Sequence, residues 1–300
     1  MSSIQDLFGG RRRLLAIIFF IYLLLTASYY LINSPTFLSA EDTKPNTVVL
    51  ANPEQDDVTP VSNGPMGFDH IYVINLPHRD DRRIRMKAIA DYLGVTFTFV
   101  DGVYTNDTEV EMYTEKYGAN STAPQVACWR SHMNVYDVMI KNDDQSALIL
   151  EDDIDAEANI ERRVNEMRPH LPKDWDAWFL GHCHGKEWRG KVLGHPNLHV
   201  AVQPQCTHAY AVSRKGARKL LNVLAEIDRA IDKTIRNKYR EGQLKIFSVQ
   251  PPITGQLRMR GNPSDVNPGA LALKGSGQAL LEDSVYMRLL KEGLYKPDDA

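Results

Sequence analysis

The chain has 300 residues, of which 43% are hydrophobic, so it can bury the core of one large or two small domains. Its formal net charge of −3 is close to neutral and does not indicate a polyanionic partner such as nucleic acid. No segment repeats at a fixed period, which argues against a solenoid or a propeller.

The N-terminal part has the pattern of a signal anchor. Three arginines, Arg11 to Arg13, precede nineteen uncharged and mostly apolar residues, and about 20 such residues cross a bilayer. Because arginines stay on the cytoplasmic side, we expect a cytoplasmic tail over residues 1–13, a transmembrane helix over 14–32 and a lumenal remainder in the Golgi or endoplasmic reticulum. Cleavage near Ala27 or Ala40 is the alternative reading.

Residues 33–67 are rich in proline and polar side chains and contain few large apolar ones, which predicts a disordered stalk. Two N-x-[ST] sequons, at Asn106 and Asn120, agree weakly with a lumenal domain. The three cysteines are an odd number. In an oxidising lumen Cys183 and Cys206 could pair and leave Cys128 alone, whereas three reduced, buried thiols are the other possibility.

The folded part is expected to begin with a βαβ unit. A β-branched strand ends at Asn75-Leu76, a helix follows and closes at Gly94, and a second strand covers 95–100. Arg82 lies at the junction after the first strand, with Arg79, Arg83 and Arg85 nearby. In such a unit a phosphate docks at this junction, although a solvated helix face explains most of these arginines equally well.

Two further stretches carry the polar groups of a possible site. The segment Ala127 to Met133 is expected to open a helix that runs to about Lys141, with Ser131 and His132 near its start. A buried strand over 147–150 then ends in three consecutive acids, Glu151, Asp152 and Asp153. Ligands of open α/β sheets bind at such strand ends, and a hard divalent ion would neutralise the acids. A solvated acidic turn is the competing interpretation.

The second half continues the α/β pattern. His182, Cys183 and His184 follow a strand at 175–181, but a fourth zinc ligand at a standard spacing is missing, so these side chains are better read as lining a cleft. Asp232 lies on a polar, helical segment over 228–240. The other expected elements are a helix over 160–167, an edge hairpin over 197–202, a strand over 207–213, a helix capped by Ser213 over 214–224, a strand over 245–249 and a final helix over 278–290.

Several blocks in this order resemble glycosyltransferase family 25. They are Ile71 to Leu76 with Asp81-Arg82-Arg83, the Cys-x-x-Ser-His block ending at His132, Leu148 to Asp153, Ala209 to Ser213 followed by Asp232, and Ser264-Asp265-Val266. The chain departs from the family at Ala127, where glycine is usual, at Arg130, and before Asp232, where the usual proline is absent.

The resemblance implies a GT-A-like nucleotide-sugar fold with a mainly parallel central sheet over 68–273, followed by a C-terminal helix and tail over 274–300. It also implies an inverting transferase with a UDP-sugar donor, most readily UDP-galactose, and Mn²⁺ or Mg²⁺. The acceptor would be a glycan or a glycoprotein.

The residue roles that follow are hypotheses. Asp153, with Asp152 or Glu151, would hold the metal while another of these carboxylates contacts the ribose. Because side chains alternate along a strand, Glu151 and Asp153 would share one face and Asp152 would point the other way. A bend at the strand end is the alternative, and it would bring Asp152 to the same site. Arg82 would meet the donor phosphates, and Asn75, Ser131 and His132 would line the donor site with Glu151. Asp232, His182 or His184 would be the base, and Asp152 is a further catalytic candidate.

Two other readings remain open from the sequence. A catalytically inactive lumenal domain that binds glycans or partner enzymes would explain the departures near Cys128 and Asp232. A metal-dependent phosphohydrolase also uses strand-end acids, but it would normally show further His and Asp ligands at short spacing.

Overall fold

A computed structural model describes residues 64–117, 120–183, 186–257, 264–266 and 281–297. The predicted cytoplasmic tail, transmembrane helix and nearly all of the stalk lie outside the described residues, as do His184 and the whole of 267–280. Within the described ranges, no helix combines the length and the apolar character that crossing a membrane requires.

The centre of the fold is a mixed eight-stranded sheet. Its order is β2 (Thr98–Asp101), β1 (His70–Asn75), β3 (Ser146–Glu151), β8 (Ala209–Ser213), β5 (Ala177–Phe179), β9 (Ile246–Val249), β7 (His195–Val200) and β6 (Val192–Leu193). Only β8 and β7 run against the direction of the other six strands. A two-stranded sheet pairs β4 (Ile154–Ala156) with β10 (Thr254–Gln256). The prediction of a mainly parallel central sheet is thus confirmed, and the arrangement fits a GT-A-like fold.

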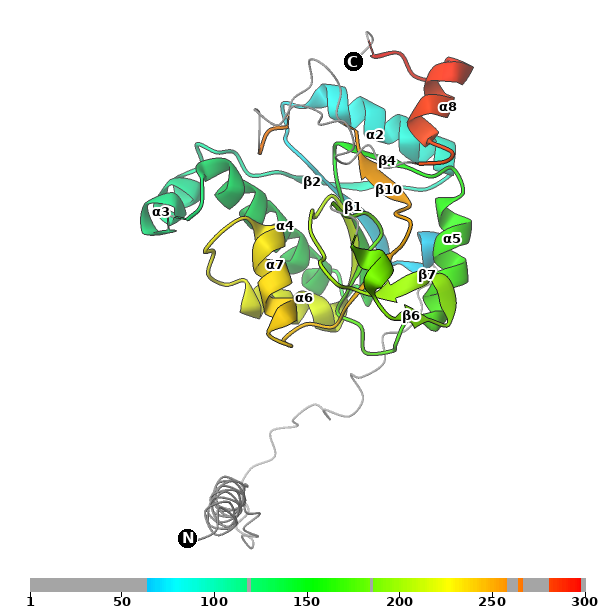
Figure 1. Cartoon of the computed structure of the whole chain (residues 1–300). Helices are drawn as coiled ribbons and strands as arrows, with labels where there is room; N and C mark the ends of the chain where they lie inside the picture. The colour runs from blue at the N-terminus through cyan, green and yellow to red at the C-terminus, as the bar shows by residue number, and fades with distance from the viewer. Residues whose placement is uncertain (1–63, 118–119, 184–185, 258–263, 267–280, 298–300) are drawn as a thin grey trace, which may run out of the picture. The chain divides into compact units, whose positions relative to one another are not determined.

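Helices cover both faces of this sheet (Figure 1). One face carries α2 (Asp80–Leu93), α5 (Ile160–Met167) and α8 (Val285–Glu292), and the other carries α3 (Thr108–Tyr117), α4 (Ala123–Lys141), α6 (Arg214–Val223) and α7 (Ile231–Arg240). Three short 3₁₀ helices cover Pro65–Gly67, Arg168–His170 and Glu187–Arg189.

Strand β3 shows why both faces are apolar. Leu148 and Leu150 belong to the core on the α2 side, whereas Ala147 and Ile149 belong to the core on the α4 side. Successive side chains point to opposite faces of a sheet, so an unbroken apolar run is what a strand between two helical layers requires.

Several local predictions are confirmed. The βαβ unit is present, and its helix ends at Gly94, whose φ of 66° suits glycine at a helix C-terminus. The Ser213 hydroxyl accepts a hydrogen bond of 3.0 Å from the Gly216 amide and so caps α6. A Cβ at Gly216 would lie 2.0 Å from the Asp176 carbonyl oxygen, so glycine allows α6 to approach the sheet.

Other boundaries differ from those expected. Helix α4 begins at Ala123, four residues before the predicted start, because Pro124 lies in its first turn and Gln125 accepts a hydrogen bond of 3.2 Å from the Thr122 amide. Ser131 and His132 therefore lie in the middle of the helix. Helix α7 starts at Ile231 rather than at 228. Helix α3 and the small β4–β10 sheet were not predicted.

Candidate active site

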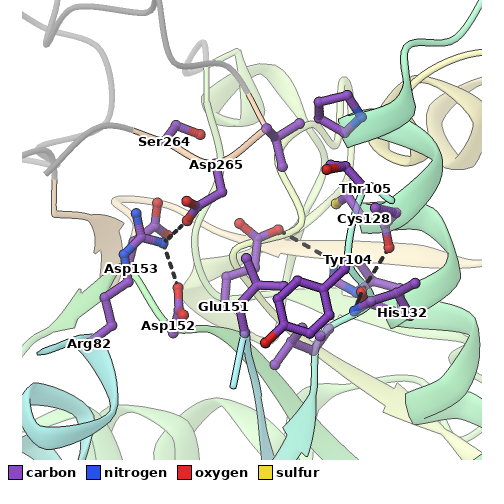
Figure 2. A pocket seen from close by; sticks show the side chains of 18 of the residues that line it. Arg82, Tyr104, Thr105, Cys128, His132, Glu151, Asp152, Asp153, Ser264 and Asp265 are labelled. Atoms are coloured by element: carbon purple, nitrogen blue, oxygen red, sulfur yellow. Dashed lines mark hydrogen bonds and ion pairs between the residues drawn. The ribbon is translucent and has the colours of Figure 1, made fainter. Parts of the chain in front are cut away.

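A cavity of about 290 Å³ opens at the carboxyl ends of β1 and β3. The loop after β2 and the middle of α4 complete its wall (Figure 2). Of the residues predicted for the site, six line this cavity: Arg82, Ser131, His132, Glu151, Asp152 and Asp153. The parallel pairing of β1 with β3 brings their ends together, as ligand sites of open α/β sheets require.

The three consecutive acids do not follow the strand alternation that was expected. Strand β3 ends at Glu151, and Asp152 and Asp153 form a turn. All three residues line the same cavity, so Asp152 does not point away as regular alternation predicts, and the alternative of a bend at the strand end holds instead. The pleat stops where the strand hydrogen bonds stop, and a turn redirects the side chains that follow.

Asp152 is neutralised by the first βα unit. Its Oδ1 accepts a hydrogen bond of 2.7 Å from Arg82 Nη1, and its Oδ2 accepts one of 2.8 Å from Asn75 Nδ2. Arg85, which is 1% exposed, donates to the backbone carbonyl of Asp152 at 2.9 Å. Burial lowers the pKa of Arg85. These contacts fix the turn, and they make Asp152 a weaker candidate for metal binding than its neighbours.

Arg82 also contacts an acid from the far end of the chain. Its Nη1 lies 3.0 Å from an Asp265 carboxylate oxygen, and Arg79 donates to both oxygens of Asp265 at 2.8 and 3.0 Å. Figure 2 shows Arg82 between Asp152 and Asp265. The predicted phosphate-binding arginine thus lies in the cavity beside a second arginine, and both are held by carboxylates.

Glu151 ends a buried chain of polar groups. Its Oε1 accepts from the Thr207 hydroxyl at 3.0 Å and lies 3.4 Å from His132 Nε2, while His132 Nδ1 lies 2.9 Å from the Tyr210 hydroxyl. The Tyr210 hydroxyl in turn lies 2.6 Å from that of Tyr136. Burial acts to raise the pKa of Glu151, but the hydrogen bond and charge of His132 lower it overall, with help from Thr207. The carboxylate is therefore ionised near neutral pH.

Two side chains of α4 have different roles in the cavity wall. The Ser131 hydroxyl donates to the Ala127 carbonyl at 2.7 Å and accepts from the Val103 amide at 2.9 Å, so it anchors the loop after β2 to the helix. Cys128 lines the cavity as a free thiol. Burial raises the pKa of Cys128, and the negative charges of Glu151, Asp232 and Asp153 add to the effect.

Of the three candidate bases, His184 lies outside the described residues, and Asp232 and His182 are not part of the cavity lining. Asp232 lies at the start of α7, where its carboxylate accepts from the amides of Cys206 at 3.2 Å and Lys233 at 2.7 Å. His182 is buried, and its Nε2 lies 3.2 Å from the Val249 carbonyl oxygen. Burial lowers the pKa of His182. The disulfide that the sequence allowed joins Cys183 to Cys206.

Sequence reasoning gave no role in the site to Thr207 or Tyr210, and it did not find Tyr104, whose ring stacks on His78 with centroids 5.5 Å apart. Tyr210 lies on β8, and Thr207 precedes it. Because β8 is antiparallel to β3, the amino end of β8 lies beside the carboxyl end of β3. A search restricted to carboxyl ends of strands misses them. The available signal was the Thr-His-Ala-Tyr run before Ser213.

A sequence model of glycosyltransferase family 25, described as an LPS biosynthesis protein family, matches residues 68–235. This match covers more than half of the chain and includes every predicted site residue. The chain therefore belongs to glycosyltransferase family 25, as its motifs indicated.

Curated relatives agree with this assignment. The chain is 34% identical over 174 residues to procollagen galactosyltransferase 1-B of Xenopus laevis, covering 52% of this chain and 28% of the relative. It is 29% identical over 196 residues to procollagen galactosyltransferase 1 of Danio rerio, covering 59% and 31%. Inactive glycosyltransferase 25 family member 3 of Homo sapiens is 31% identical over 172 residues, covering 52% and 29%. The chain thus matches about three tenths of the length of each relative.

Proposed function

We propose that the chain is a metal-dependent, inverting glycosyltransferase that transfers a hexose from a UDP-sugar to a glycan or glycoprotein. Galactose is the first candidate sugar, because two of the similar relatives are named procollagen galactosyltransferases. The observation that carries the proposal is the cavity itself, which Arg82 lines together with Glu151, Asp153 and Asp265 at the end of a parallel strand pair.

The donor set of this cavity fits a hard divalent ion. Mn²⁺ and Mg²⁺ prefer carboxylate oxygens, and the carboxylates of Glu151, Asp153 and Asp265 line one space. Asp153 with Glu151 or Asp265 would hold the ion, since Asp152 is engaged by Arg82 and Asn75. When bound, such an ion supplies Lewis-acid stabilisation of charge on a diphosphate.

The arginines and the candidate bases have separate tasks in this proposal. Arg82 and Arg79 bind the donor phosphates, for which they exchange their contacts with Asp265. The acceptor hydroxyl must lose a proton as it attacks the sugar carbon. Asp232 is the favoured base, because its charge is felt at Cys128 in the cavity wall and its partners are backbone amides rather than a cation.

We further propose that residues 14–32 anchor the chain as a type II membrane protein of the Golgi or endoplasmic reticulum, with residues 68–273 as the lumenal catalytic domain. The sequon asparagines Asn106 and Asn120 are both exposed, as acceptors of a lumenal glycan must be. When the chain is expressed in secretory cells, endoglycosidase treatment should remove its glycans and increase its electrophoretic mobility. A chain unaffected by that treatment, and equally unaffected when both asparagines are replaced, would contradict the lumenal placement.

The activity is tested with the full chain purified in detergent. UDP release is measured with a panel of UDP-sugars in Mn²⁺, in Mg²⁺ and in chelator, and the anomeric configuration of any product is read by NMR. We expect one sugar to support turnover with metal only, and a β-linked product from an α-linked donor. Absence of turnover with every sugar and metal would contradict the proposal.

A second candidate function has one observation in its favour. The human relative named as inactive is 31% identical, close to the 34% of the named galactosyltransferase. An inactive domain would still bind glycans or partner enzymes. It would give no UDP release in the same assay but retain binding on a glycan array.

A further inference from the structure

One cluster in the cavity wall has the chemistry of a different kind of metal site. Cys128 and His132 lie one helical turn apart on α4, and Glu151 ends β3 opposite them. One ligand atom of each, a sulfur, a ring nitrogen and a carboxylate oxygen, lie within 4.8 Å of one another. All three side chains line the cavity, so a bound ion would be open to solvent on one side.

The spacing of these atoms is close to that of a tetrahedral site. Zinc–nitrogen and zinc–oxygen bonds of about 2.0–2.2 Å place those two ligands about 3.4 Å apart at a tetrahedral angle. The observed distance between His132 Nε2 and Glu151 Oε1 is 3.4 Å. The longer zinc–sulfur bond places the sulfur about 3.6 Å from each of them, and the Cys128 sulfur lies within 4.8 Å of both, so a small movement of the side chain completes the site.

The groups behind the ligands orient them for an ion. The Tyr210 hydroxyl, 2.9 Å from His132 Nδ1, can accept a hydrogen bond from that nitrogen and donate one to Tyr136. A bound ion would take the place of the proton that Nε2 shares with Glu151 in its absence, and this tautomer then directs the Nε2 lone pair at the ion. The Thr207 hydroxyl fixes Glu151 from the other side. Metal-binding histidines and carboxylates are usually held in this way by a second layer of hydrogen bonds.

The identity of the ligands selects the ion. A thiolate and an imidazole favour Zn²⁺, Co²⁺ or Cd²⁺, whereas Mn²⁺ and Mg²⁺ prefer oxygen alone. We propose that Cys128, His132 and Glu151 form a site for a thiophilic divalent ion, with Zn²⁺ as the first candidate. Binding forms a metal–sulfur bond and releases the thiol proton to solvent, and water takes the fourth position.

The other cluster of this kind among the described residues does not compete. Cys183, Cys206 and His208 also lie within range of one another, but the two sulfurs are bonded in a disulfide and cannot act as thiolates. The part of the chain that the structure describes therefore offers one site for a thiophilic ion. Glu151 cannot bind this ion and contact a sugar donor at the same time. Bound zinc would therefore keep Glu151 from taking part in a donor complex.

Cobalt titration tests the site directly. The full chain, purified in detergent and stripped of metal by a chelator that is then removed, is titrated with Co²⁺. We expect one equivalent to bind with a thiolate-to-cobalt charge-transfer absorption in the near ultraviolet, and Zn²⁺ to abolish the absorption. Excess Mg²⁺ should not. No charge-transfer absorption in the wild-type chain would overturn the proposal without any variant being needed.

Variants assign the ligands. Cys128→Ala should abolish the charge-transfer absorption, and Cys128→Ser, which nearly keeps the volume, is the second substitution in case alanine impairs folding. Tyr210→Phe should keep the absorption but weaken zinc binding about 10- to 100-fold, because it removes the group that orients His132. Asn134→Ala, on the same helix but outside the cavity lining, is the matched control, and its spectrum should be unchanged.

An absorption that persists in both Cys128 variants would place the thiolate elsewhere and overturn the assignment. The inference does not depend on transferase activity, since every readout here is metal binding. A chain that binds cobalt in this way but transfers no sugar would therefore contradict the proposed function and not this site.

Discussion

Two groups of buried acids lie on either side of Ile154, and they differ in what holds them. Asp153 and Asp155 are both 6% exposed. The first lines the cavity with Glu151. The second accepts hydrogen bonds from the Tyr286 amide at 3.0 Å and the Ser284 hydroxyl at 2.5 Å, so it attaches the start of α8 to β4.

Glu157 belongs to the second group. Its two carboxylate oxygens accept from the amides of Glu282 at 2.8 Å and Asp283 at 3.0 Å. Backbone donors cannot leave when a ligand arrives, whereas the arginine, histidine and hydroxyl partners around the cavity can exchange. Burial and sequence alone do not distinguish the two groups; the partners do. Asp155 and Glu157, held by amides at the start of α8, stabilise the fold, whereas Glu151 and Asp153, which line the cavity, are available for chemistry.

The strongest test of this contrast is a pair of substitutions. Asp153→Ala should lower sugar transfer at least about 100-fold, because a metal-holding carboxylate is worth several kcal/mol of transition-state stabilisation. UDP release under saturating Mn²⁺ measures it. Asp155→Ala, at the same exposed fraction, should leave the turnover of the folded protein unchanged. Full activity in the Asp153 variant would remove that residue from the metal site.

Arg82→Ala should have the largest effect on stability. The substitution leaves the Asp152 carboxylate buried without its cation, and losing one partner of a buried ion pair costs about 3–5 kcal/mol. Denaturant unfolding of the full chain in detergent measures the change. Arg162→Ala, in the exposed pair with Glu166, is the control and should change stability by less than about 1 kcal/mol. Equal effects would mean that Asp152 is solvated.

Glu157→Ala should destabilise the attachment of the C-terminal helix. It leaves the Glu282 and Asp283 amides without their acceptors, which costs less for these part-buried groups than the about 1–3 kcal/mol of a fully buried one. Hydrogen exchange should show faster exchange of those amides and of α8, with the cavity loops unaffected. Loss of transfer without this local opening would contradict the division into two groups.

The smallest expected effect is a difference in pH dependence between the two groups. The pKa of Glu151 is lowered, because His132 and Thr207 outweigh the effect of burial. The unfolded chain then binds more protons, so the contribution of Glu151 to stability is lost as the pH falls through its folded pKa. Burial raises the pKa of Asp155 despite its hydrogen bonds, so its contribution is present at low pH and is lost as the pH rises through that value.

Glu151→Gln should therefore make the unfolding free energy fall less steeply with acid, and Asp155→Asn should make it fall more steeply. The measurement is denaturant unfolding between about pH 3 and 6 with a chelator present. A change of slope in the same direction for both variants would show that the two carboxyls do not have opposite shifts.

The fold was largely predictable because its signals are local. The apolar run before Glu151, the glycine at 94 and the cap at Ser213 each determine an element from a few neighbouring residues. Helix α3 was missed because its mixed polar sequence gives little periodicity. The start of α8 is fixed by Ser284, which accepts from the Met287 amide at 3.0 Å, and by its contact with Asp155. The second of these is a long-range contact, which no local pattern contains.

The sequence predicts which residues lie at the site, but it does not predict the partner of each one. Strand-end acids and a junction arginine mark the cavity in the sequence. Which acid is paired with Arg82 depends on a turn that begins directly after Glu151. The contribution of Asp265 comes from a contact 183 positions away from Arg82, and Thr207 reaches Glu151 only because β8 is antiparallel.

The buried pair of Arg82 and Asp152 has a consequence for how the family can diverge. Neither residue can be exchanged alone without leaving a buried charge, so over generations the two positions should change together or not at all. In a lineage that stops transferring sugar, the need to neutralise this buried charge remains after the need to bind a donor has gone, so the pair is expected to outlast the activity. The presence of the pair in a relative therefore shows that the fold is retained and does not by itself show that the relative still transfers sugar.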